Sequence, residues 1–486
     1  MDLRNSPYVP GAGTRPVALA GRDDIIERFD VTLSRLEAGR ADTAPLIMGA
    51  RGSGKTVLLN EFGAMAKKRG WFVASEEVIP NTPLSSLIAV LAHEVLLEMS
   101  TRHRVAANVR RALGVLKAFT AVSALGVSLS IDVDAVRGTA DTGLFSRDLR
   151  RLFTEIGEVA KEQSVGVVFS LDEIHTLESD ELSDLNSAMH RTAQLGLPVV
   201  FIGAGLFPSW QQAGRIKQSP LRLSSYVARM ETSFVRLKPL DSAASREAFT
   251  APALSEGVDF SDAALDEAVQ FCQGNSWLIQ LMGAEVWEVS SGPTIALFDV
   301  QVASDRVRQK LNQWFFPRLT RGCTDKELEI LALIANGSHH GIMNFDSVSD
   351  CANSLQLDGA WAVRYALTEL AKRDLIELEY TDGPIYDNDG FGVRLSVPMM
   401  DDYFRTTGGI FGFSAVHHTN NEKSEPYSRP SELPGKSNVP RELVTPRPGA
   451  GRDGEGQLPA WRGRPGRTKE EPAAMRLRHR RRLPQR

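Results

Sequence analysis

One glycine-rich segment constrains this chain more than any other feature of its sequence. Residues 46–56 read LIMGARGSGKT, a short apolar run followed by the pattern GxxxxGKT, and residues 57–70 continue as a helix-compatible stretch that closes at Gly70. Glycines let successive backbone N–H groups turn inward around phosphate oxygens, and the N-terminus of the next helix adds partial positive charge. The pattern therefore predicts a strand, a phosphate-binding loop and a helix, with a chance glycine turn before a helix as the alternative.

The residues of this loop have distinct expected roles. Lys55 is expected to reach the β- and γ-phosphates of ATP, and the Thr56 hydroxyl is expected to ligate Mg²⁺. Because such a loop binds largely through its backbone, each of its residues is a nucleotide-binding candidate. These candidates are Gly49, Ala50, Arg51, Gly52, Ser53, Gly54, Lys55 and Thr56.

A pair of acids follows a second apolar run. Residues 165–173 read VGVVFSLDE, which is typical of a buried parallel strand with carboxylates at its C-terminal edge. Asp172 is expected to hold Mg²⁺ through its water shell, and Glu173 to orient and polarise the water that attacks the γ-phosphate. The alternative is a strand followed by an acidic helix cap.

Further apolar runs predict the rest of a sheet. Strands are expected at residues 71–75, 198–203 and 233–237, separated by helical stretches. Strand and helix alternate over about 220 residues, which favours an α/β fold with a parallel sheet and a nucleotide at the strand C-termini. The longest weakly polar run, residues 118–131, is too short and too rich in Ser and Thr to span a bilayer.

Four segments carry a family resemblance: YVPGAGTRPVALAGRDDIIERF, GARGSGKTVLLNEF, SLDEIHTL and GAGLFPSW. The chain resembles AAA+ ATPases of the origin-recognition and replication-initiator type over residues 8–405, and especially an actinobacterial group of ATP-binding proteins. The resemblance implies a P-loop NTPase sheet, a helical lid domain and a winged-helix domain. It also implies that residues 17–22 pack against adenine; a plain lead-in to the next helix is the alternative.

The chain departs from this family at its sensors. The fourth strand ends with Gly203 and Ala204, where active members place a polar residue, and no Arg or Lys lies between Arg246 and Arg306, where the lid arginine is expected. Arg222 or Arg229 could serve as an arginine finger for a neighbouring subunit in a homo-oligomer, or be an exposed helix charge. We expect ATP binding with slow hydrolysis. His175 either contacts the nucleotide or a neighbour, or merely starts a helix.

The predicted domains are an ATPase domain at 1–240 with an insertion at about 101–140, a lid at 241–319, a winged helix at 320–405 and a tail at 406–486. In the insertion, a basic amphipathic helix over 101–120 precedes alternating residues 126–134, typical of a half-buried strand. The helix could meet nucleic acid, anionic lipid or an acidic partner, or be a solvated face over a small core.

Helices at 324–336, 347–355 and 360–373 and a hairpin after residue 374 make up the predicted winged helix. If it binds DNA, Arg364, Lys372 and Arg373 would face phosphates or bases. Five acidic residues between 377 and 389 argue against DNA on the wing, because binding to phosphates needs positive charge. A protein partner is the alternative.

Charge divides the chain into unlike parts. Residues 417–486 hold sixteen basic and eight acidic residues, and ten of the 25 prolines, so the net charge of -4 combines +8 there with -12 elsewhere. With few large apolar residues, this tail is expected to be disordered. Three unpaired cysteines indicate a reducing, cytoplasmic compartment. Three readings stay open: a nucleotide switch that engages DNA, a signalling or scaffold switch that binds a protein, and a ring-forming ATPase motor or loader.

Overall fold

The computed structural model describes residues 1, 3–102, 106–124, 127, 129–206, 234–337, 343–344, 348, 359–380 and 391–406. The chain divides into two units, Met1–Pro426 and Tyr427–Arg486, and all described residues belong to the first. The expected tail at 406–486, apart from residue 406, lies outside the described residues. So do Arg222 and Arg229, and nearly all of the helix expected at 347–355.

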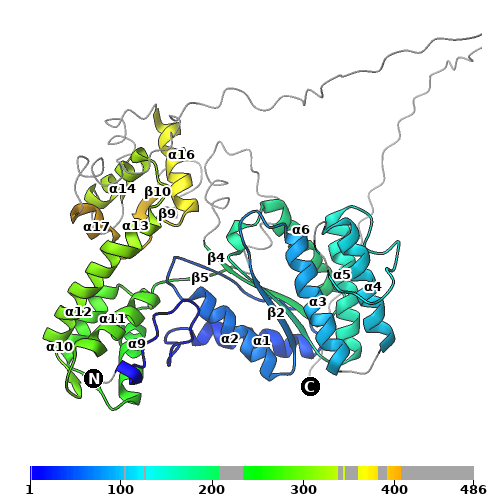
Figure 1. Ribbon diagram of the computed structural model, residues 1–486, viewed down its shortest axis with the longest axis horizontal. Helices are drawn as coiled ribbons and strands as arrows, with labels where there is room; N and C mark the ends of the chain where they lie inside the picture. Colours follow the sequence, from blue (N-terminus) through cyan, green and yellow to red (C-terminus); the bar gives the residue numbers. More distant parts are fainter. Residues whose placement is uncertain are drawn as a thin grey trace, which may run out of the picture. The chain divides into compact units, whose positions relative to one another are not determined.

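A five-stranded parallel sheet forms the centre of the N-terminal half of the chain (Figure 1). Its strand order is β2-β3-β4-β1-β5. The order places β1, with its glycine-rich loop, between β4 and β5. The predicted α/β fold with a parallel sheet is therefore confirmed. The strands are β1 (Leu46–Gly49), β2 (Phe72–Glu77), β3 (Val167–Asp172), β4 (Val199–Gly205) and β5 (Phe234–Leu237).

Helices cover both faces of this sheet, which explains why its strands read as continuous apolar runs. On one face, α1 (Asp23–Glu37) and α2 (Lys55–Lys68) bury Phe29 and Phe62, whose rings stack 4.2 Å apart between centroids. On the other, Phe153 stacks on Phe169 of β3 at 4.9 Å. The helices of this second face are α3 (Leu84–Arg102), α4 (Ala106–Val122), α5 (Phe145–Glu162) and α6 (Ser179–Gln194).

The insertion corrects one prediction. Residues 127 and 129–136 form no strand, although their apolar side chains do pack on the core, as the alternation indicated. Instead the segment lies along α4: the Lys117 ammonium donates to the carbonyls of Ile131 and Val133, and Val136 N donates to Gly114 O. A strand needs a partner strand for its backbone groups, and here the basic side chain of α4 satisfies two of them.

Helix α3 is long and apolar enough to raise the question of a membrane span. By length and composition, the window Leu84–Thr101 would suffice to cross a membrane, with a mean hydropathy of 1.3. Half of that window is buried inside the protein, against β2, α4 and α5. This burial is typical of a core helix in a globular domain, and the sequence analysis had singled out a different run.

The lid begins with α9 (Ser242–Ser255). After it come α10 (Asp262–Cys272), α11 (Ser276–Val289) and α12 (Leu297–Lys310), and a small parallel pair of β6 (Asp259–Phe260) and β7 (Thr294–Ile295), which was not predicted. A π-helical turn, η4 (Leu311–Phe315), and α13 (Phe316–Leu319) complete it. Tyr8, from the N-terminal segment, is buried in the lid core and donates its hydroxyl to Phe249 O.

The C-terminal domain combines helices with an antiparallel sheet of order β8-β10-β9. The predicted hairpin is confirmed as β9 paired with β10, and its turn lies outside the described residues. The elements are α14 (Asp325–Gly337), β8 (Met343–Asn344), α16 (Gly359–Lys372), β9 (Ile376–Tyr380), β10 (Phe391–Leu395) and α17 (Met400–Thr406).

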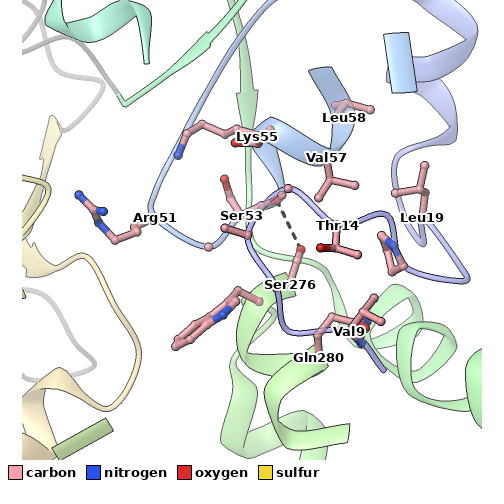
Figure 2. Close-up of a pocket in the computed structure, with 18 of the residues that line it drawn as sticks. Val9, Thr14, Leu19, Arg51, Ser53, Lys55, Val57, Leu58, Ser276 and Gln280 are labelled. Carbon is pink, nitrogen blue, oxygen red and sulfur yellow. Dashed lines mark hydrogen bonds between the residues drawn. The ribbon is translucent and has the colours of Figure 1, made fainter. Parts of the chain in front are cut away.

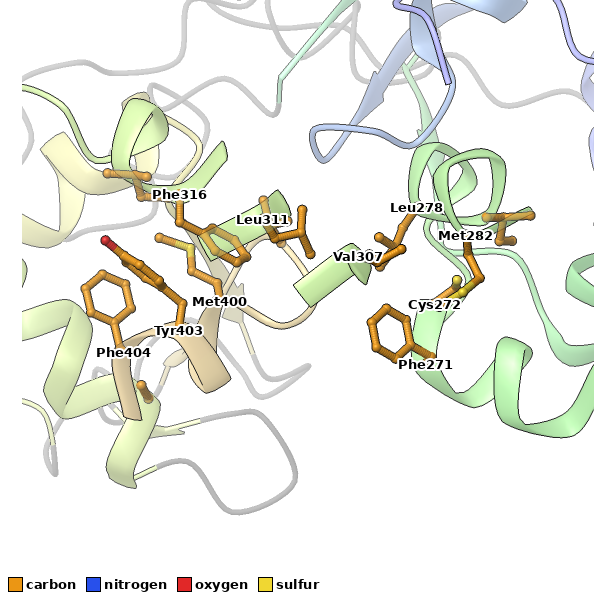
Figure 3. Close-up of a cluster of buried hydrophobic side chains, with 14 of the residues drawn as sticks. Phe271, Cys272, Leu278, Met282, Val307, Leu311, Phe316, Met400, Tyr403 and Phe404 are labelled. Carbon is orange, nitrogen blue, oxygen red and sulfur yellow. The ribbon is translucent and has the colours of Figure 1, made fainter. Parts of the chain in front are cut away.

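The lid and the C-terminal domain share one hydrophobic core (Figure 3). Phe316, which is fully buried, packs its ring 5.1 Å from that of Tyr403 on α17. Leu311 and Val307 continue the same cluster into α12 and towards Phe271 of α10. Residue 319, the expected boundary between the two domains, therefore does not separate two cores.

This core predicts a stability difference between two phenylalanines. Phe316→Ala should lower the free energy of unfolding by about 3–5 kcal/mol, the usual cost of removing a buried aromatic ring. Phe298→Ala, at a side chain that is 71% exposed on α12, should change it by less than about 0.5 kcal/mol. Denaturant unfolding followed by circular dichroism measures both, and equal losses would contradict the shared core.

Candidate nucleotide-binding site

The glycine-rich loop joins β1 to α2 at the C-terminal edge of the sheet. Gly54 precedes α2 with a φ of 90°, and Gly52 has a φ of 79°, backbone conformations that favour glycine. A side chain at Gly52 would also meet Asn275, because an added Cβ would lie 2.7 Å from its Oδ1. Helix α2 starts at Lys55, so its first amides, which lack intrahelical acceptors, face the loop.

The carbonyl groups of this loop are held by donors from several parts of the chain. Lys55 Nζ donates to Gly49 O and Ala50 O, both at 3.0 Å. Asn275 Nδ2 donates to Arg51 O at 3.1 Å, and the Trp277 amide donates to Gly52 O at 2.9 Å. These hydrogen bonds hold the loop carbonyls, and with them the course of the loop backbone, in place.

Two side chains share the next carbonyl, Ser53 O. Arg22 Nη2 donates to it at 3.3 Å, and Ser276 Oγ donates to it at 3.4 Å (Figure 2). Arg22 also donates to Lys238 O at 3.1 Å, at the end of β5. Burial lowers the pKa of Arg22 from its ordinary value, but an arginine remains charged at neutral pH. The sequence analysis gave this arginine no role of its own.

A cavity of about 390 Å³ opens beside the loop, within the range of small-molecule sites. Its charged lining residues are Arg22, Arg51, Lys55 and Glu173, so three cations face one carboxylate. Apolar walls come from the N-terminal segment, the lid and residue 206. This combination of cations at one end and apolar surface elsewhere suits a ligand with an anionic part and a flat apolar part. The walls include Val9, Pro16, Ala18, Leu19, Leu206, Leu240, Trp277 and Phe315.

The segment expected to pack against adenine lies at this cavity in part. Ala18, Leu19 and Ala20 line it, whereas the Val17 side chain is 53% exposed. The preceding residues are fastened to the lid: Val9 N donates to Gln280 Oε1 at 3.1 Å, and Trp277 Nε1 donates to Pro10 O at 3.1 Å.

Lys55 is almost fully buried in the loop that it serves. Its side chain contacts only loop carbonyls, as described above, and burial lowers the pKa of the ammonium. Nearby carboxylates oppose this effect and raise the pKa of Lys55; Asp374 raises it most, followed by Glu173 and Asp172. A nucleotide phosphate would offer the same ammonium a stronger, charged acceptor.

The two expected metal ligands lie together. Thr56 Oγ1 donates to Asp172 Oδ2 at 2.6 Å, although 116 residues separate them, and Asp172 Oδ1 accepts from the Glu173 amide at 2.8 Å. A hydroxyl and a carboxylate are oxygen ligands of the kind that Mg²⁺ prefers, with phosphates and waters supplying the rest. Within the described residues, no cluster of three His, Cys, Asp or Glu side chains offers an all-protein metal cage.

Glu173 reaches the cavity from an uncommon backbone conformation. Its φ is 55°, in the left-handed region, and its carboxylate lies 3.1 Å (Oε2) from Nδ1 of His175. This contact is close but poorly aligned, so Nδ1 makes no well-directed hydrogen bond. The His175 side chain lowers the pKa of Glu173, more than burial raises it. The carboxylate is therefore ionised at neutral pH.

The fourth strand supplies no polar group here, as the sequence indicated. Strand β4 ends at Gly205, and an added Cβ there would lie 3.0 Å from His175 N. Leu206, the next residue, contributes an apolar side chain to the cavity. On the lid, Asn275, Ser276 and Trp277 stand where an arginine was expected. Their contacts with the loop could not be derived from the sequence, although the motif GNSWLIQ marked the place.

The C-terminal domain also reaches the loop. Asp374, in the turn between α16 and β9, accepts a hydrogen bond from Arg51 N at 2.9 Å through Oδ2, which lies 3.6 Å from Arg51 Nε. Burial raises the pKa of Asp374 to about 6, against the lowering effect of Lys55 and Arg51. One backbone amide of the phosphate loop, that of Arg51, therefore already donates to a carboxylate, that of Asp374.

The three candidate DNA contacts lie on or just after α16. Lys372 donates to Glu369 at 2.8 Å. Arg373 donates to Gly322 O at 3.0 Å and lies 3.4 Å from Glu327, so it ties α16 to the start of α14. Arg364 lies on the same helix and is half-buried. Lys372 and Arg373 are therefore engaged within the domain.

Comparison with known families bears on this geometry. Residues 18–202 match the family model of the AAA ATPase domain, a range that contains the loop, Asp172 and Glu173. This part of the chain is similar to an AAA ATPase domain, which supports nucleotide binding there. The comparison with curated proteins gave no match.

Solved structures resemble the chain at low identity. The Walker-type ATPase PABY2304 of Pyrococcus abyssi is 15% identical, with 81% of this chain and 97% of that one covered and a TM-score of 0.49. The ORC2 protein of Aeropyrum pernix is 14% identical, with 84% and 98% covered and a TM-score of 0.46. The ORC1 protein of the same organism, in complex with DNA, is 14% identical, with 80% and 94% covered and a TM-score of 0.38.

The loop predicts a loss of nucleotide binding in one lysine variant. Lys55→Ala should weaken ATP binding by at least about tenfold to a hundredfold, because hydrogen bonds to charged groups contribute about 1.5–3 kcal/mol. Lys68→Ala, at the exposed end of the same helix, should leave binding unchanged. Isothermal titration with ATP and Mg²⁺ measures both, and equal affinities would contradict the assigned role of Lys55.

Proposed function

We propose that this protein is an ATP- and Mg²⁺-dependent switch that hydrolyses ATP slowly, and whose nucleotide state controls how its C-terminal domain engages a partner. The observation that carries the proposal is the contact between Asp374 and the phosphate loop. It joins the domain that would meet the partner to the backbone that would meet the phosphates.

Electrostatics explain why a nucleotide would disturb this contact. The raised pKa of Asp374 means that its ionised form is less stable in the docked position than in water. A phosphate charge about 5 Å from the carboxylate would repel it by roughly 3 kcal/mol at an effective dielectric constant of ~20. ATP would therefore compete with Asp374 at the loop, and its binding would favour release of the C-terminal domain.

Hydrolysis follows from the groups around the cavity. A water oxygen would attack the γ-phosphorus while the bond from that phosphorus to the bridging oxygen breaks, so that ADP leaves with the electron pair. Glu173 would accept a proton from the water and pass it to solvent. Mg²⁺, held by Thr56 and through Asp172, would neutralise charge on the phosphate oxygens. With glycine at the end of β4 and no arginine between Arg246 and Arg306, where the lid arginine was expected, we expect slow turnover.

The C-terminal domain is proposed to be a winged helix, with β9 and β10 as its wing. Its binding partner is either DNA, which would contact Arg364, Lys372 and Arg373, or a protein. One observation favours the protein: the wing residue Glu377 pairs with Arg394 of the same sheet and lies 3.5 Å from Arg236 of β5. These ion pairs consume positive charge that binding to phosphates would need. An arginine finger from a second copy, at Arg222 or Arg229, stays part of the homo-oligomer proposal.

Asp374 yields a prediction about coupling. Asp374→Ala should raise the affinity for ATP about threefold to tenfold, because it removes a competing acceptor worth ~1 kcal/mol from the loop. It should also make amide hydrogen exchange at β9 equally fast with and without ATP, whereas ATP accelerates it in the unaltered chain. Asp401→Ala, which removes an exposed carboxylate of α17, is the control. Unchanged affinity and exchange would contradict the switch.

A salt titration distinguishes a DNA partner from a protein partner. If DNA is the partner, a chain lacking residues 427–486 should bind duplex DNA, weaken steeply as salt rises, and lose affinity in Arg364→Ala. If a protein is the partner, this chain should show no shift with duplex at low salt. The Glu173→Gln protein, held with ATP, should then retain a protein partner on affinity purification. The comparison with the full chain shows what the basic residues beyond 426 contribute.

A further inference from the structure

The turn η2 (Ile174–Thr176) lies across the glycine end of β4. An added Cβ at Gly203 would lie 2.9 Å from Ile174 Cδ1, and one at Gly205 would lie 3.0 Å from His175 N, so side chains at these positions would press against the turn. The glycines thus leave the space in which this turn, and with it His175, packs against β4. The end of β4 carries no polar side chain, and the turn after β3 lies beside it.

The His175 ring is held against the carboxylate of Glu173. Its side chain is only 17% exposed, and Nδ1 is buried with Glu173 Oε2 as its charged neighbour at 3.1 Å. A buried ring nitrogen without a well-directed hydrogen bond carries a desolvation cost unless it finds a partner. Catalytic hydrogen bonds are often poorly aligned in nucleotide-free proteins and tighten when the ligand binds.

The backbone fixes Glu173 in the same arrangement. A φ of 55° is uncommon for a residue with a side chain and costs on the order of 1 kcal/mol or more. The conformation is retained because three contacts determine it: Asp172 Oδ1 accepts from Glu173 N, and Thr176 donates to Glu173 O from both its amide and its hydroxyl. The turn therefore orients Glu173 and His175 together, at the edge of the cavity that Glu173 lines.

We infer that His175 is a positioning residue for hydrolysis: it holds the Glu173 carboxylate toward the attacking water, in the place that β4 leaves without a polar side chain. This inference rests on the hydrolysis proposed above. His175 touches neither the water nor the phosphate. It acts by restricting the rotamers of Glu173, so that the carboxylate stays directed at the place where the water would attack.

The test separates orientation from nucleotide binding. His175→Phe keeps a ring of similar size without nitrogen, and it should lower kcat about tenfold, a typical order of magnitude for a misdirected catalytic group, while KM for ATP changes less than about twofold. His175→Asn places an amide near the position of Nδ1 and should retain kcat within about threefold. His190→Phe, on the exposed face of α6, is the matched control and should change neither constant.

A double substitution tests whether His175 affects hydrolysis through Glu173. In the Glu173→Gln background, His175→Phe should cause no further loss of kcat, because the carboxylate that it positions is already gone. A further tenfold loss there, an unchanged or raised kcat in His175→Phe, or equal losses in the Phe and Asn variants would each overturn the inference. If His175→Phe does not fold, as judged by thermal unfolding, His175→Ala takes its place in the same comparison.

The same assay distinguishes the two proposals. If the unaltered chain turns over ATP no faster than Glu173→Gln, the proposed hydrolysis is wrong and the inference fails with it. If Glu173→Gln slows turnover but His175→Phe does not, hydrolysis stands and only the role of His175 is wrong.

Discussion

The structure depends on how the carbonyl groups of the phosphate loop are held. Each carbonyl from Gly49 to Ser53 accepts a hydrogen bond, and the donors come from α2, from the lid and from the N-terminal segment. A peptide unit has one donor and one acceptor on opposite sides, so fixing the carbonyls also fixes the directions of the amides. Helix α2, the lid and the N-terminal segment before α1 therefore all help to shape one loop of eight residues.

Local patterns in the sequence predicted most of the sheet and the centre of the site. Strands β1, β3, β4 and β5 were expected within one or two residues of their bounds, because buried parallel strands have continuous apolar runs. Thr56 and Asp172 were both expected to serve Mg²⁺, since the carboxyl ends of parallel strands lie at one edge of the sheet. Their hydrogen bond of 2.6 Å joins them.

What the sequence could not predict are contacts between distant segments. Residues 127–136 alternate like a strand, but alternation reports burial and not pairing, and the backbone of this segment bonds to Lys117 instead. The acids at the wing looked like an exposed strip, whereas Glu377 has arginine neighbours on β5 and β10. Asp374 carried no local signal at all, and its role arises only because the fold brings it to Arg51, 323 residues away.

The shared core of the lid and the C-terminal domain limits how this protein can change shape. Separating α13 from α17 would expose Phe316, Tyr403 and Phe404 to water, at a cost of several kcal/mol. The described residues of 242–406 therefore share one core, and the short connection between β5 and α9, residues 238–241, joins them to the sheet. Because Tyr8 is anchored in the same core, the N-terminal segment makes a second connection between this core and the sheet. Any movement of the lid relative to the sheet must therefore displace two connections of the chain and not one.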